Sequence, residues 1–167
     1  MTIEHHITLW DGKSAAGIKA VFDAYHADAD FSDKIVSLSF TPSCEIGATW
    51  LLKAWLEAGN RLTARQIAKI YPALNHLQHW QAKLHLLQSM SYMPISEADS
   101  IHVYHFLRLT LTDQNKFVRA WAYHGFYLLS SQHSKYLNET KQYFQMALRD
   151  EAPSVKARIR NISKTGF

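Results

Sequence analysis

The apolar residues after Ser43 recur at helical spacing. The first such stripe contains Ile46, Trp50, Leu51, Ala54 and Trp55, and it ends before Gly59-Asn60, a pair that commonly stops helices. Residues 80–90, 103–109, 118–128 and 134–148 carry the same pattern. Apolar side chains three and four residues apart share one face of a helix, so the pattern predicts helices from residue 43 onward.

Several residues predict where these helices begin and end. Thr63 with Gln66 has the spacing of a capping box, and Pro72 should kink or end the helix that starts there. Asp113 is placed to cap the helix around residues 118–128. Pro153 suits the first turn of the last helix.

The first 42 residues follow a different pattern. Apolar and polar residues alternate over residues 3–9, which predicts an extended arm covering residues 1–13. Ser14 can cap a helix from about Ala15 to His26, and residues 27–33 form a polar loop. Residues 34–40 fit either a helix turn or a strand, and we favour the helix. We expect residues 14–167 to form a single domain.

Part of the sequence repeats. Five positions recur 37 residues later in the same order: Leu111, Asp113, Val118, Arg119 and Ala120 correspond to Leu148, Asp150, Val155, Lys156 and Ala157. The second helices of the predicted hairpins begin near residues 46, 80, 118 and 155. A repeat of this length is typical of stacked helical hairpins, so the fold class predicted is all-α, with about four hairpins in a superhelix.

The repeated phrase resembles the HEAT repeat. The motif is similar to that family's pattern: a leucine, any residue, an aspartate, four further residues, a valine and a basic residue. The segment from Ile70 to Leu74 looks like the proline-kinked end of that family's first helix. The resemblance covers about residues 43–164. It implies a right-handed, curved scaffold whose second helices line the concave side and which binds proteins or nucleic acid, rarely an enzyme.

Composition and charge narrow the functions to consider. The chain has 167 residues, of which 47% are hydrophobic, and a formal charge of +4. Its single cysteine, Cys44, excludes an intrachain disulfide and suits a cytoplasmic protein. No apolar run approaches the ~20 residues of a membrane span, and the first residues do not resemble a signal peptide. The positive charge would favour an acidic protein partner or nucleic acid.

Five residues form the predicted partner-binding face, on the second helices: Lys83, Arg119, Tyr123, Lys156 and Arg160. Arg119 and Lys156 also have a structural interpretation, because each could pair with an aspartate of its own repeat or the next one. The basic last helix fits a polar end of the array as well as it fits a binding surface. Trp50, Trp80 and Trp121 are expected in the core, whereas Tyr123 and His124 are expected at the surface.

Catalytic and metal sites are not indicated. His76 with His79, and His102 with His105, are three residues apart, but neither pair has a third ligand at suitable spacing. No nucleophile arrangement and no glycine-rich phosphate loop occur. The sequence therefore predicts a non-catalytic protein-binding scaffold or adaptor without cofactors. The alternatives are nucleic-acid binding through the same basic face, as in HEAT-like glycosylases, and a histidine-metal hydrolase.

Overall fold

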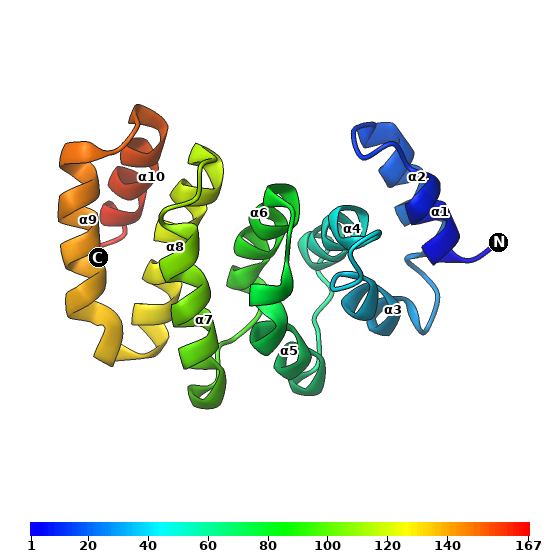
Figure 1. Ribbon diagram of the computed structural model, residues 1–167. Coiled ribbons are helices and arrows are strands. Elements are labelled where there is room, and N and C mark those ends of the chain that lie inside the picture. Colours follow the sequence, from blue (N-terminus) through cyan, green and yellow to red (C-terminus); the bar gives the residue numbers. More distant parts are fainter. The chain divides into compact units, whose positions relative to one another are not determined.

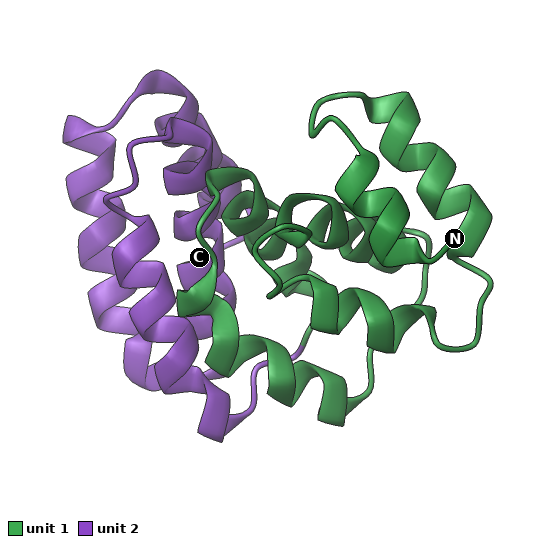
Figure 2. Ribbon diagram, turned by 45° about the vertical axis from the view of Figure 1, so that its right-hand side comes forward, with its two compact units in different colours: residues 1–93 green, residues 94–167 purple.

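The computed structural model describes residues 1–167 and is entirely helical, as the sequence predicts (Figure 1). It contains ten α-helices, three short 3-10 helices and no strand. The chain divides into two compact units, residues 1–93 and residues 94–167 (Figure 2). The single domain predicted for residues 14–167 stays a prediction.

Unit 1 contains six α-helices: α1 (Ile3–Leu9), α2 (Ala15–Tyr25), α3 (Phe31–Leu38), α4 (Glu45–Glu57), α5 (Ala64–Ile70) and α6 (Trp80–Ser89). Two 3-10 helices, η1 (Tyr71–His76) and η2 (Met90–Tyr92), follow α5 and α6. Unit 2 contains α7 (Glu97–Thr110), α8 (Lys116–Gln132), η3 (Ser134–Tyr136), α9 (Leu137–Asp150) and α10 (Pro153–Ser163).

The predicted extended arm at the N-terminus is wrong, because Ile3–Leu9 forms α1. Thr2 caps this helix by accepting a hydrogen bond from the His5 backbone N–H (3.2 Å). Ile3 and Ile7 are one helical turn apart, and both are buried. A Cβ atom at Gly47 of α4 would lie 2.8 Å from Ile7 Cγ2, so this glycine permits the close approach of α1. Contact with α4 thus selects a helix where alternation predicted an extended chain.

Most of the predicted helix boundaries are confirmed. Ser14 accepts a hydrogen bond from Gly17 N and caps α2 (3.0 Å), and Thr63 and Gln66 form both bonds of the capping box (2.9 and 3.2 Å). The helix that Pro72 was expected to end stops at Ile70 and continues as η1. Residues 34–38 are helical, as favoured, although α3 already begins within the predicted loop at Phe31, whose ring is buried.

Asp113 does not cap a helix as expected, and the repeated Asp150 does not cap one either. Asn115 is the cap of α8, since its side chain accepts from Phe117 N (2.9 Å) and Val118 N (3.2 Å). Asp113 instead shapes the preceding turn by accepting from Asn115 N (2.8 Å). Asp150 is the last residue of α9, and α10 begins at Pro153 without a side-chain cap.

Helix α8 packs against α7 on one side and against α9 and α10 on the other. Gly125 faces α7, where an added Cβ atom would overlap Cδ2 of Leu107. Tyr123 faces α9, is 7% exposed, and makes an edge contact with Phe144 (5.9 Å between ring centroids). Trp121 lies between these two faces and remains partly exposed.

The sequence assignment of these side chains is therefore wrong. We expected Tyr123 at the surface and Trp121 in the core. One apolar stripe cannot describe a helix that has neighbours on two sides. Trp80 was also expected in the core, but it occupies the first turn of α6 and is 42% exposed.

Polar side chains connect neighbouring hairpins within each unit. In unit 1 the buried carboxylate of Glu45 accepts from the backbone N–H groups of Gln78 (2.8 Å) and His79 (2.6 Å), just before α6. In unit 2 Gln132 accepts from Ile95 N (2.8 Å). Most such bonds between sequence-distant residues span 31 to 38 positions. This separation matches the spacing of the predicted repeats.

Replacing Glu45 by alanine should lower the free energy of unfolding by about 2–4 kcal/mol, because two partly buried N–H groups lose their acceptor. Glu57→Ala is the control. Glu57 ends the same helix but forms a solvent-exposed pair with Lys53, so its loss should cost less than about 0.5 kcal/mol. Urea unfolding of the two variants measures the difference. Equal costs would show that the bonds of Glu45 do not stabilise unit 1.

Tyr123→Ala should destabilise the protein by about 3–4 kcal/mol, because it removes a buried ring from the contact with α9. Trp121→Ala removes a larger but partly exposed ring and should cost about 1–2 kcal/mol. The same urea experiment compares these variants. A larger cost for Trp121→Ala would restore the assignment made from the sequence.

Candidate partner-binding surface

The five residues of the predicted face belong to both units. Lys83 lies on α6 of unit 1, where it is partly buried. Arg119 and Tyr123 lie on α8, and Lys156 and Arg160 lie on α10, all in unit 2. A single candidate surface can therefore be built only from the residues of unit 2.

Tyr123 does not belong to this surface. Its ring is buried in an apolar cluster with Phe144, Val155 and Ile159. Burial raises the pKa of the Tyr123 hydroxyl to about 12, and the charge of Glu151 adds to the shift. The residue is a neutral core side chain, and the prediction that it contacts a partner is not supported by its position.

Arg119 has the structural role that the sequence offered as an alternative. Its Nε donates to Glu151 (2.9 and 3.2 Å to the two carboxylate oxygens), and Nη1 donates to the backbone carbonyls of Asp113 (3.0 Å) and Gln114 (3.2 Å). The partner is a glutamate of the next turn, where an aspartate was expected. With 21% of its side chain exposed, Arg119 stabilises two turns and is not available to a ligand.

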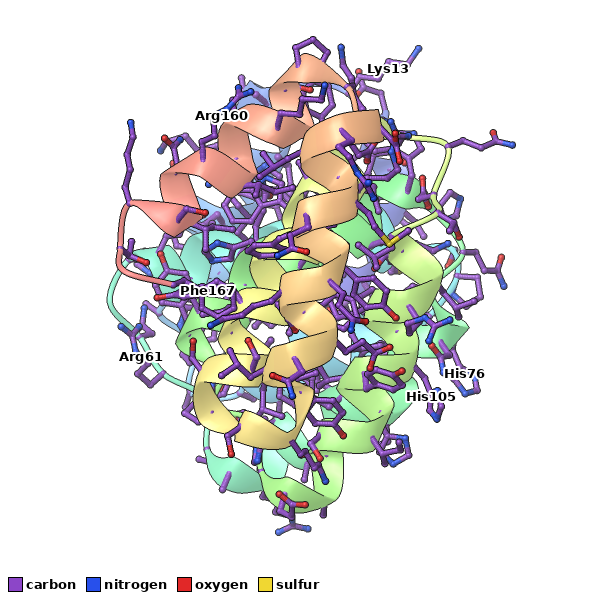
Figure 3. All side chains as sticks on the ribbon, turned by 90° about the vertical axis from the view of Figure 1, so that its left-hand side faces the viewer. Lys13, Arg61, His76, His105, Arg160 and Phe167 are labelled. Atoms are coloured by element: carbon purple, nitrogen blue, oxygen red, sulfur yellow. The ribbon has the colours of Figure 1, made fainter.

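Lys156 and Arg160, the remaining predicted residues of unit 2, lie on helix α10. Val155, Ile159 and Ile162 are buried, and they fix the face that α10 turns toward its neighbours. Lys156 is partly exposed. Arg160, labelled in Figure 3, is exposed. Neither forms an ion pair, and no acidic residue follows Glu151 in the sequence.

The net positive charge of the chain comes from unit 2, because the formal charges of unit 1 sum to zero. Residues 94–167 contain ten lysines and arginines against six aspartates and glutamates, whereas residues 1–93 contain eight of each. Three of the ten basic residues pair with acids: Arg108 with Glu139, Arg119 with Glu151 and Lys135 with Glu97. Helix α10 and the residues after it therefore provide much of the unpaired charge.

A cation–aromatic contact beside α10 was missed by the sequence analysis. The Arg158 guanidinium carbon lies 4.1 Å from the ring centroid of Trp121 on α8. His124 meets the same indole edge-on at 5.1 Å, and Tyr127 contacts Phe167 at 5.1 Å. The i, i+3 spacing of Trp121 and His124 could have indicated a shared face, had Trp121 not been assigned to the core.

Two histidines in the chain are held neutral by burial. Burial lowers the pKa of His124 to about 4, with a smaller contribution from the charge of Arg158, and its Nδ1 has no hydrogen-bond partner. Burial likewise lowers the pKa of His85 to about 4, with the charge of Lys53 second. The Nδ1 of His85 forms a hydrogen bond with Thr49 Oγ1 (3.0 Å).

The histidine pairs singled out in the sequence do not build a metal site. His76 lies in η1 and His79 follows it, so the two do not share a helix face as expected; His79 Nδ1 lies 2.9 Å from Glu45 Oε1. His102 and His105 are exposed on α7. No group of three or more histidine, cysteine, aspartate or glutamate side chains is arranged to hold a metal ion. None of the helices has the length and apolar character needed to cross a membrane.

No family model, curated protein or solved structure matches the chain. The resemblance to HEAT repeats accordingly stays a prediction from the sequence.

The two buried histidines should make stability depend on pH. In the unfolded chain a histidine titrates near pH 6.5, so between about pH 6.5 and 4 the unfolded state binds more protons than the folded one. The free energy of unfolding should therefore fall as the pH decreases through this range. His124→Phe should reduce that fall by about 1–2 kcal/mol.

Urea unfolding at about pH 7 and about pH 4.5 measures this effect. His105→Phe is the control, because His105 is exposed in the same unit and its replacement should leave the pH dependence as it is. An unchanged pH dependence in His124→Phe would mean that this ring is not kept neutral by the fold.

Proposed function

We propose that the chain is a non-catalytic binding module that holds an acidic protein segment on α10 of unit 2. Lys156, Arg160 and Lys164 carry unpaired charges on this helix or directly after it, and this observation supports the proposal most directly. A surface of one charge attracts partners of the opposite charge and speeds their association. The apolar residues of α10 fix the helix against α8 and α9, so these charges project from a rigid support.

The same proposal includes a HEAT-like arrangement of the hairpins in a short superhelix. The hydrogen bonds that span 31 to 38 positions within each unit support it, because a stacked array of equal hairpins would produce this separation. Such an array would serve as a scaffold or adaptor. The single, buried Cys44 is compatible with a cytoplasmic location.

Nucleic acid is the second candidate partner. The aromatic rings of Trp121, His124 and Tyr127 lie near basic residues, a combination that binds single strands through base stacking. Arg158 already covers one face of the Trp121 indole, however, and His124 meets its edge. A base would have to use the other face or displace Arg158, and we therefore favour the acidic protein segment.

Charge reversal on α10 tests the proposal. Lys156→Glu with Arg160→Glu should weaken binding of a fluorescein-labelled, glutamate-rich peptide at least about tenfold, because two attractions become repulsions. The melting temperature should stay nearly unchanged, since neither side chain forms an ion pair. Fluorescence anisotropy at two salt concentrations measures the affinity, with single-stranded and duplex oligonucleotides as parallel probes.

Lys141→Glu with Arg149→Glu is the matched control. It changes the net charge equally within unit 2, but the two side chains are exposed on α9. Their reversal should alter peptide affinity by less than about threefold. An equal loss in both double variants would mean that only net charge attracts the peptide. Tighter binding of the oligonucleotides, lost on reversal of Lys156 and Arg160, would favour the nucleic-acid function.

A further inference from the structure

A groove of about 500 Å³ runs between α1 and α2 in unit 1. Its volume lies in the range of small-molecule sites, roughly 300–1,000 Å³. Small residues of α2, Gly17, Ala20 and Ala24, form one wall, and Leu9 and Trp10 contribute to the other side. Leu9 is 66% exposed, so the groove has an apolar rim that no side chain of this chain covers.

The groove is held open by a fixed tryptophan. The Trp10 indole N–H donates to the Ser14 carbonyl (2.8 Å), which holds the ring against the first turn of α2. A Cβ atom at Gly17 would lie 3.0 Å from Trp10 Cδ1, so only glycine fits comfortably beside the ring. The ring therefore has little freedom to fold into the space over Ala20 and Ala24, and the groove is a preformed feature of the hairpin.

The polar side chains at one end of the groove are those of His6 and Tyr25. The Tyr25 hydroxyl has a single hydrogen, and it donates this hydrogen to the Met1 carbonyl (3.1 Å). The Tyr25 oxygen also lies 2.6 Å from His6 Nδ1, so this hydrogen bond joins α1 to α2 at this end of the groove.

The other end holds the one acidic side chain of the lining. Asp11 Oδ1 accepts from Lys13 N and Ser14 N (2.8 Å each), while its second oxygen has no partner. These backbone hydrogen bonds lower the pKa of Asp11, so the carboxylate stays charged. The Trp10 N–H is already used within the chain. The lining thus contains no lysine or arginine, and one Asp11 oxygen has no partner within the chain.

We propose that this groove binds a small organic amine whose ammonium group pairs with Asp11 and whose apolar body lies along Leu9, Ala20 and Ala24. The ring of Trp10 adds a cation–aromatic attraction to the site. A volume of about 500 Å³ has room for a body of one aromatic ring with a short alkyl chain. This site is independent of the basic surface proposed on α10.

Three probes that differ only in their polar group test the ligand class: 4-phenylbutylamine, 4-phenylbutanol and 4-phenylbutyrate. In calorimetric titrations of the full chain, the amine should bind roughly two- to fivefold more tightly than the alcohol, and the carboxylate should bind most weakly. Asp11→Asn keeps an oxygen acceptor for the two backbone N–H groups and should remove the preference for the amine. Asp28→Asn, at an exposed position that does not line the groove, should preserve it.

A substitution that fills the groove tests the location. Ala20→Phe should weaken binding of the amine and of the alcohol at least about tenfold. Ala16→Phe, exposed on the same helix outside the groove, should bind as the unmodified protein does. Binding of the carboxylate as tightly as the amine, absence of amine binding, or unchanged binding in Ala20→Phe would overturn the proposal. The variant with Lys156→Glu and Arg160→Glu should retain the amine, which separates this site from the proposed function.

Discussion

Buried and partly buried polar groups at the turns join neighbouring hairpins by hydrogen bonds. Glu45 reaches 33 and 34 positions along the chain to accept the N–H groups before α6, and Arg119 reaches 32 positions to Glu151. An apolar contact tolerates a small slip, because one methyl group can replace another. A hydrogen bond to a buried group does not tolerate such a slip, because losing the bond costs roughly 1–3 kcal/mol. The rest of each unit packs around the spacing that these bonds impose.

Features set by local chemistry could be predicted from the sequence. The capping box of Thr63 and Gln66 and the helix end at Pro72 depend on residues within one or two turns. Helix α1 could not be predicted with equal ease, because Ile3 and Ile7 fit both an alternating strand and one face of a helix. The choice depends on Gly47, which is 40 positions after Ile7 and leaves room for its side chain.

Only the part of the candidate surface that depends on spacing within one helix could be predicted. Sequence spacing places Lys156 and Arg160 together on α10, and this holds in the structure. It could not show that Tyr123 is buried, because α8 has packing partners on two sides and Phe144 lies on a different helix. The groove beside α2 could not be predicted from the sequence either. It depends on the position of the Trp10 ring and on the small size of Gly17, Ala20 and Ala24.

Arg119 and Lys156 occupy the same position of the repeated phrase but have different environments. The turn after α9 supplies Glu151, which pairs with Arg119 and removes its charge from the surface. Lys156 forms no ion pair within residues 1–167. A basic residue at this position therefore stabilises two turns where the next turn provides an acid, and it stays unpaired where none does. The repeat predicts where the basic residue lies in the chain. Whether that residue forms an ion pair depends on an acidic residue in the following turn.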